Sequence, residues 1–285
     1  MNDYYRPMGF RVLPPVVKNL LILNGLFFLA TLAFQSAFNI DLIDKLGLHY
    51  ITADKFNPIQ FVTYMFLHGG FTHILFNMFA LWMFGNTLEN IWGPKRFLIY
   101  YLATGIGAAI IHYITIYFSL QPTLALLNSF LSEPGFNNLQ QLVVGHKFQI
   151  NQYSGEIYGA FRQFDVNYKI LQGDPGNYTA LQGAVEFLGE YKAYYLNLPN
   201  VVGASGAVFG ILLAFGMMFP NSIIYIYFAF PIKAKWFVII YGAIELYLGI
   251  SGRGGNVAHF AHLGGMIFGY FLIIYWRRTD RLKFF

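Results

Sequence analysis

Three short segments of the chain hold the side chains that could carry out nucleophilic chemistry. Residues 203–206, Gly-Ala-Ser-Gly, place a serine among small residues, and residues 259–262, His-Phe-Ala-His, supply two imidazoles. Residues 68–77 add two further histidines and an asparagine. A serine with a histidine within hydrogen-bond reach is an activated nucleophile. Ser205 and His262 are therefore candidates for an acyl-transfer site, provided that the fold brings them together.

The elements that must position these residues are membrane spans. The 285 residues are 56% hydrophobic and only 11% charged, whereas soluble domains usually carry about a quarter charged residues. A helix that crosses a bilayer needs about 20 apolar residues. The pattern predicts an all-α bundle of six spans, at Val16–Ala37, Phe71–Trp92, Phe97–Phe118, Ser205–Phe219, Lys235–Ile250 and Val257–Trp276.

The candidate residues share one depth in the predicted spans. Counted from the cytoplasmic ends at about 1.5 Å per residue, Asn77, Ser205 and His262 lie roughly 21–23 Å from the inner face of a core about 30 Å thick. Polar groups at such a depth are costly and usually functional. This coincidence favours one polar site below the outer surface.

Small residues predict which spans meet. Gly206 and Gly210 stand four apart on the fourth predicted span, and Ala261, Gly265 and Gly269 repeat every four on the sixth. Small residues at this spacing let two helices approach closely. The fourth span is also too short to cross if it begins at Ser205. Its start should therefore border a wet pocket, where the free N–H groups of a helix N-terminus could stabilise an oxyanion.

The orientation follows from the basic residues. They gather at one side of the predicted spans, which the positive-inside rule assigns to the cytoplasm together with both termini; these residues are Arg6, Arg11, Lys18, Lys95, Arg96, Lys233, Lys235, Arg277, Arg278, Arg281 and Lys283. Residues 120–202 then form an ordered extracytoplasmic insertion between the third and fourth spans. Within it, Ala180–Tyr195 is amphipathic, with Leu181, Ala184, Val185 and Leu188 on one face, and should lie on the membrane or on the protein.

Taken together, the segments HGGFTHILFNMFALWMFGNTLE, GASGAVFG and AHFAHLGGMIFG resemble the rhomboid family of intramembrane serine proteases. The resemblance covers all six predicted spans and implies one rhomboid-like membrane domain over residues 1–285, in the inner membrane of a bacterium. It implies cleavage of transmembrane protein substrates near their outer ends by a serine–histidine dyad that lacks an orienting carboxylate. No cofactor or metal is implied.

The resemblance also suggests individual roles. Ser205 would be the nucleophile and His262 the base, while His73, Asn77 and the backbone N–H of Ser205 would hold the oxyanion. Phe209 matches an aromatic residue that stacks on the catalytic histidine, and Gly203, Gly206 and His259 would line the site. His68 and Glu89 match structural positions. The Trp-Arg pair that many rhomboids carry in the first outer loop has no counterpart within Phe38–Gln60.

Other interpretations stay open. His73 and Asn77 could serve only as interhelical hydrogen-bonding groups, and His259 could lie at the mouth of the pocket. Glu245, in the fifth predicted span, should face the bundle or lie near the outer interface. A non-catalytic rhomboid-like protein that binds transmembrane clients is one alternative function, and a metal site built from His68, His73, His259 and His262 is another. The scattered positive charge does not indicate nucleic acid, and the absence of cysteine excludes thiol catalysis.

Overall fold

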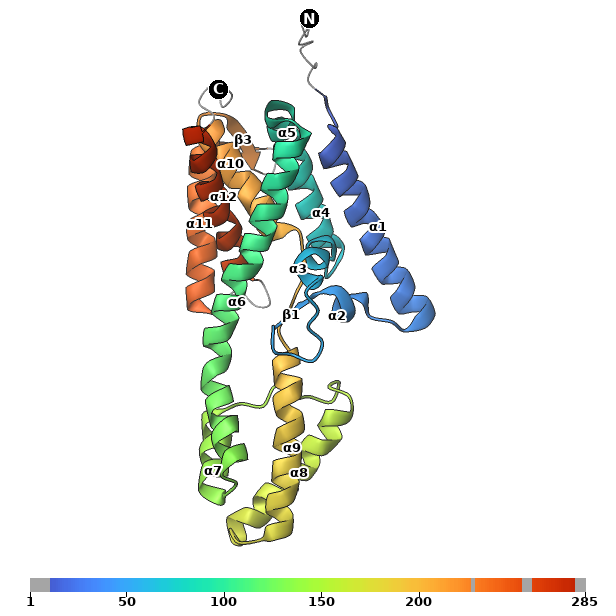
Figure 1. The fold of residues 1–285 in the computed structure, drawn as a ribbon, viewed down its shortest axis with the longest axis vertical. Helices are drawn as coiled ribbons and strands as arrows, with labels where there is room; N and C mark the ends of the chain where they lie inside the picture. Colours follow the sequence, from blue (N-terminus) through green and yellow to red (C-terminus); the bar gives the residue numbers. More distant parts are fainter. Residues whose placement is uncertain (1–10, 227–228, 253–257, 280–285) are drawn as a thin grey trace, which may run out of the picture. The chain divides into compact units, whose positions relative to one another are not determined.

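The computed structural model describes residues 11–226, 229–252 and 258–279, which divide into two compact units (Figure 1). The first unit contains residues 1–48, 58–113 and 201–285, and the second contains residues 49–57 and 114–200. All predicted site residues belong to the first unit. The predicted basic residues Arg6, Arg281 and Lys283, and Val257 at the start of the sixth predicted span, lie outside the described residues.

The helices of the first unit match most of the predicted spans closely. The first, second, fourth and fifth predictions agree with the structure to within one residue at each end. The elements are α1 (Pro15–Phe38), α2 (Leu42–Leu46), α3 (Gln60–Thr63), the 3-10 turn η1 (Tyr64–Phe66), α4 (Phe71–Ala80), the π-helical turn η2 (Leu81–Gly85), α5 (Asn86–Trp92), α6 (Pro94–Ser132), α10 (Ser205–Met218), α11 (Ala234–Ser251) and α12 (His259–Thr279). The strands β1 (Leu48–His49) and β2 (Asn200–Val201) have two residues each, one in either unit, and α6 belongs to the second unit from residue 114 onward.

The boundary of the third predicted span needs correction, and one pair of strands was not predicted. The third predicted span ends at Phe118, but α6 continues through Pro122 to Ser132. The reason is that Leu127 and Phe130, near its C-terminal end, are fully buried in the second unit, and their burial stabilises the longer helix. An antiparallel pair of strands that was not predicted, β3 (Ile223–Ile226) and β4 (Phe230–Lys233), lies between α10 and α11.

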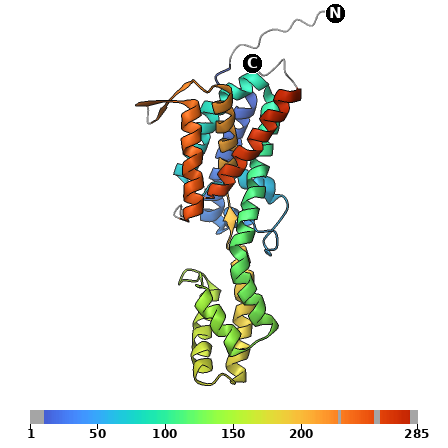
Figure 2. The same cartoon turned by 90° about the vertical axis from the view of Figure 1, so that its left-hand side faces the viewer.

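Four of the described helices are long and apolar enough to cross a membrane: α1, α6, α11 and α12. Their outer faces expose large apolar side chains, such as Leu26 and Leu29 on α1 and Ile239 on α11. Exposing such apolar faces to water is unfavourable, whereas contact with lipid is not. The 14-residue α10 is shorter than a usual span and lies beside α11 and α12 (Figures 1 and 2). Six crossings therefore stay a prediction.

A buried glutamate fixes the start of α1. Both carboxylate oxygens of Glu89 on α5 accept backbone hydrogen bonds, from Val16 N at 2.9 Å and from Val17 N at 2.7 Å. These are N–H groups that the first helical turn leaves without an intrahelical partner. Pro15 begins the helix and needs no such partner. This contact gives a physical basis for the structural role expected of Glu89.

The second unit has an aromatic core of its own. It contains α7 (Phe136–Gly145), α8 (Glu156–Gly173) and α9 (Tyr178–Asn197). Of the residues predicted to share one face of α9, Ala184 and Leu188 are buried, whereas Leu181 and Val185 are only half-buried. The other buried residues of this helix are Ala180, Phe187, Tyr191 and Tyr195. That face packs on protein, because Phe187 stacks on Phe164 of α8 with 4.6 Å between ring centroids. The location of the second unit outside the membrane stays a prediction.

Candidate active site

Ser205 is the first residue of α10, and the glycine two residues before it has an unusual conformation. Gly203 has φ of +128°, a region that other residues rarely adopt. Its N–H donates to the Tyr64 carbonyl at 2.8 Å, which ties this turn to η1. A Cβ at Gly203 would lie only 2.8 Å from two ring atoms of His73. The turn before Ser205 therefore requires glycine both for its backbone and for the close imidazole.

Helices α10 and α12 meet through glycines, as predicted, although one part of the prediction needs correction. A Cβ at Gly265 would lie 1.9 Å from the carbonyl oxygen of Gly206, so the two backbones touch there. The other repeated glycines face a third helix instead. Gly210 lies against Thr104, and Gly269 lies against Tyr100, both on α6. The reason is that each helix packs against several neighbours, so a four-residue repeat does not identify one partner.

The approach of α10 to α12 brings His262 to Ser205. His262 Nε2 lies 2.8 Å from Ser205 Oγ, and the imidazole is 9% exposed. Phe209, one turn along α10, stacks on the His262 ring with 4.2 Å between centroids and 4° between planes. This parallel stacking holds the plane of the imidazole. The predicted stacking partner therefore occupies the place that the resemblance implies.

A carboxylate also contacts His262, a contact that the sequence did not predict. Glu245 Oε2 on α11 lies 2.8 Å from His262 Nδ1 and 2.7 Å from His259 Nδ1. The resemblance implied a dyad without an orienting carboxylate, and no Asp or Glu lies on α4, α10 or α12, the helices that carry the other candidate residues. Glu245 comes from a neighbouring helix and is 4% exposed. The only signal in the sequence was an ionisable residue inside an apolar stretch.

His73 and Asn77 lie on one face of α4, one turn apart. The contact with Gly203 places the His73 ring beside the turn that leads to Ser205, and the rings of His68 and His73 pack edge to face at 5.0 Å. Asn77 is 7% exposed, and its buried Nδ2 finds no acceptor among the described residues. A buried amide without a partner is costly, so Asn77 retains a donor that a ligand could use.

Three of these residues could also hold a cation by donor type. The nearest donor atoms of Glu245, His259 and His262 all lie within 4.8 Å of one another, and two histidines with a carboxylate suit zinc. In the structure, however, these donors already bond to one another at 2.7 and 2.8 Å. His68 and His73 do not belong to this group. The four-histidine site considered above is therefore not the cluster that the fold assembles.

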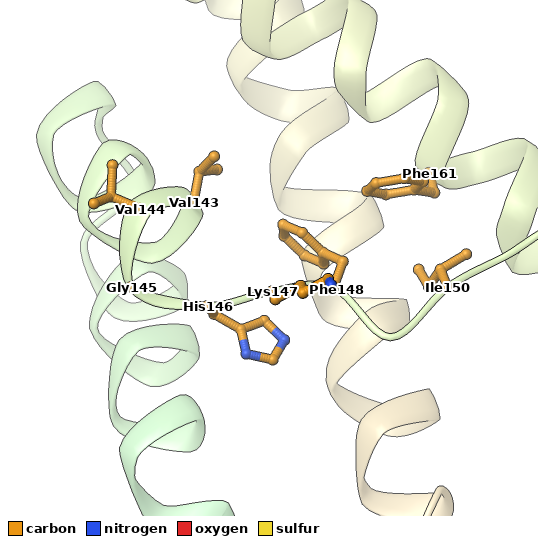
Figure 3. A pocket seen from close by; sticks show the side chains of 8 residues that line it. All are labelled: Val143, Val144, Gly145, His146, Lys147, Phe148, Ile150 and Phe161. Carbon is orange, nitrogen blue, oxygen red and sulfur yellow. The ribbon is translucent and has the colours of Figure 1, made fainter.

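A separate pocket lies in the second unit and includes no predicted site residue. Figure 3 shows its lining, which comes from the end of α7, the segment that follows and α8, namely Val143, Val144, Gly145, His146, Lys147, Phe148, Ile150 and Phe161. His146 Nε2 lies 2.7 Å from the Tyr191 hydroxyl and Nδ1 lies 3.1 Å from Thr123 Oγ1. Burial lowers the pKa of His146 and raises the pKa of Tyr191 to about 12. Both groups are therefore neutral near pH 7.

Comparison with known proteins agrees with this arrangement. The family model described as "Rhomboid domain" matches residues 55–122 and 176–279, more than half of the chain, and leaves most of the predicted insertion unmatched. Two proteins of Bacillus subtilis (strain 168) are similar over shorter stretches. The "Putative rhomboid protease YdcA" is 41% identical over 56 residues, or 20% of this chain and 28% of that protein.

The second protein, "Rhomboid protease GluP", is 40% identical over 55 residues, or 19% of this chain and 11% of that protein. The aligned stretches thus cover less than a third of either relative. With its apolar helices, the chain is an integral, multi-pass membrane protein. The match of the family model over most of the six predicted spans shows that the chain belongs to the rhomboid family.

Proposed function

We propose that the protein is an intramembrane serine endopeptidase in which Ser205 is the nucleophile and His262 the general base. The observation that carries this proposal is the 2.8 Å contact between Ser205 Oγ and His262 Nε2 in a largely buried site. A serine hydroxyl is a weak nucleophile by itself and needs a base within hydrogen-bond distance. The names of the related proteins support the same reaction.

The reaction follows from these two side chains. Ser205 Oγ forms a bond to the carbonyl carbon of the scissile peptide, and its proton moves to His262 Nε2. The carbonyl electron pair moves onto oxygen and gives a tetrahedral oxyanion. The C–N bond then breaks, and the Nε2 proton goes to the leaving amine. A water molecule attacks the resulting ester through the same base and releases the carboxylic acid and Ser205.

The oxyanion would be held by three donors beside Ser205. The first turn of α10 leaves the Ser205 N–H without an intrahelical partner, and its dipole is positive at that end. His73 lies against the preceding turn, and the amide of Asn77 has no acceptor among the described residues. Preorganised donors in a dry site are worth about 10²–10³ in kcat each. A role as an oxyanion donor would explain why the buried amide of Asn77 has no acceptor among the described residues.

The substrates would be transmembrane segments of other membrane proteins, cut near their outer ends. The site lies between apolar helices whose outer faces suit lipid, so a substrate helix would reach it from the bilayer. The distribution of basic residues supports a cytoplasmic location for both termini, and the family resemblance supports the inner membrane of a bacterium.

The alternative is a non-catalytic family member that binds transmembrane clients. Both reacting side chains are present and in contact, which favours the protease. The deciding experiment incubates the purified chain in detergent with a model single-span protein. Cleavage should be lost in Ser205→Ala and kept in Ser222→Ala, a matched serine in the turn after α10. Equal cleavage by the parent and Ser205→Ala would remove Ser205 from the mechanism.

A further inference from the structure

Glu245 is one of two glutamates among the buried residues of the described chain, and its surroundings differ from those of the other. Glu89 accepts hydrogen bonds from the backbone of α1, whereas Glu245 forms its hydrogen bonds with the imidazoles of His259 and His262. Removing a carboxylate from water costs several kcal/mol unless polar partners compensate. Glu245 and His262 lie on different helices, so their contact depends on tertiary packing and not on helix formation alone. A role connected with the histidines would account for the buried charge.

We propose that Glu245 is a positioning residue that converts the expected dyad into a Ser205–His262–Glu245 triad. This inference rests on the proposed function. The three members come from α10, α12 and α11, and the contacts run in series, 2.8 Å from Oγ to Nε2 and 2.8 Å from Nδ1 to Oε2. The order of the groups is the one by which a carboxylate orients a catalytic histidine in soluble serine proteases.

The chemical reason for this role is the tautomer of His262. An ionised carboxylate only accepts hydrogen bonds, so the Nδ1 that contacts it must carry the ring proton. Nε2 then keeps a free lone pair, which can accept the proton of Ser205. The opposite tautomer would place the proton on Nε2 and leave no base. Phe209 can hold the plane of the ring, but stacking does not distinguish the two nitrogens.

The carboxylate also matters after the proton has moved. His262 becomes an imidazolium, and Glu245 lies next to the new positive charge in a site where water screens it poorly. His259 has a distinct part in this arrangement. Its Nδ1 donates to the same Oε2 at 2.7 Å, which fixes the carboxylate from a second direction. His259 is only 7% exposed, so water competes little for this hydrogen bond.

The test combines a kinetic and a spectroscopic measurement on the full chain in detergent. The rate at which a fluorophosphonate labels Ser205 should fall about 10⁴-fold in Glu245→Gln, the size of the loss in kcat that the corresponding change causes in a soluble triad. With a cleavable model substrate, the loss should appear in kcat and not in KM. Glu245→Asp keeps the charge and should label faster than the amide variant. Glu89→Gln is the matched control, because it should lower thermal stability and leave the labelling rate of folded protein unchanged.

The ¹⁵N spectrum of the histidine-labelled parent tests the tautomer directly and needs no variant at Glu245. His262, assigned by its absence in His262→Gln, should show a protonated Nδ1 and an unprotonated Nε2. A proton on Nε2 in the parent would overturn the proposal, even if Glu245→Gln failed to fold. Equal labelling of folded parent and folded Glu245→Gln would also overturn it. So would stoichiometric zinc that is lost in Glu245→Gln, because Glu245 would then be a metal ligand.

The two proposals fail in different ways. If the parent chain is not labelled at Ser205, the proposed protease function fails. The ¹⁵N measurement still reports which nitrogen of His262 carries the proton, and a proton on Nε2 would still overturn the positioning role of Glu245. If the parent is labelled but the amide variant is labelled equally fast, the protease stands and the triad falls.

Discussion

The contact between Gly265 and Gly206 allows a quantitative prediction about how packing controls the site. A Cβ in Gly265→Ala would lie 1.9 Å from the Gly206 carbonyl oxygen, and an ordinary contact begins near 3.4 Å. Because the obstacle is backbone, α10 and α12 would have to separate locally by about 1.5 Å to relieve it. Overpacking of this kind costs about 1–3 kcal/mol of stability, or more where nothing can yield.

The same displacement would act on the reacting pair. His262 lies one turn before Gly265 on α12, and Ser205 lies next to Gly206 on α10. An increase of about 1 Å in the present Ser205–His262 separation of 2.8 Å would break the hydrogen bond. A misplacement of about 1 Å can reduce turnover about 100-fold. We therefore expect Gly265→Ala to lose at least that much kcat and to unfold at a lower temperature.

The assay is cleavage of a model single-span substrate, with thermal unfolding in the same detergent. The control is Gly25→Ala on α1, where a new Cβ meets nothing within 4 Å. That change should leave kcat unchanged and preserve or slightly raise stability. If Gly265→Ala cleaves and unfolds as the parent does, the close approach of α10 and α12 does not position the site.

Four further predictions follow from individual contacts. Gly203→Ala should lower labelling of Ser205 at least 100-fold, because the new Cβ would displace His73 and the backbone has φ of +128°. Asn77→Ala should lower kcat about 10²–10³-fold with little change in KM, measured on the model substrate. Glu89→Ala should destabilise the chain by about 2–3 kcal/mol, measured by thermal unfolding, because two buried N–H groups lose a charged acceptor. Burial lowers the pKa of His146 in the folded protein, so the unfolded state binds a proton first as the pH falls below about 6.5. Resistance of the second unit to limited proteolysis should therefore be complete above that pH. It should decline as the pH falls through the lowered pKa of the folded state.

Each of these predictions has an outcome that would contradict it. Parental labelling in Gly203→Ala would show that the turn tolerates a side chain. A change confined to KM in Asn77→Ala would assign the amide to substrate binding. An unchanged unfolding temperature in Glu89→Ala would mean that water replaces the carboxylate. His146→Gln should flatten the pH dependence of proteolysis, and an identical profile in that variant would assign the effect to other groups.

The sequence predicted the residues that meet because their signals are local. Ser205 begins an apolar helix, and the glycines beside it and beside His262 indicate close packing. Both features can be recognised from residues that are close together in the sequence. The contact of Glu245 with His262 is different, since it joins two helices and depends on how α11 rotates against α12. No periodicity reports that rotation, so the sequence indicated a buried carboxylate without its partner.

The other differences have the same origin. Helix α6 continues beyond its apolar stretch because Leu127 and Phe130 are buried in the core of the second unit. This stabilisation comes from tertiary packing, which the hydropathy of a sequence segment does not report. Strand β3 is a run of β-branched and aromatic residues, Ile223 to Ile226, a strand signal that is hard to distinguish in a chain that is apolar throughout. The aromatic face of α9 also turned out wider than the aliphatic pattern indicated.

The central claim is that His262 activates Ser205, and covalent labelling tests it most directly. The folded chain in detergent is treated with a fluorophosphonate, digested and mapped by mass spectrometry. We expect one modified serine, Ser205, and loss of that modification in His262→Ala under conditions where the variant remains folded. An unmodified Ser205 in folded parent protein, or equal modification in His262→Ala, would contradict the account.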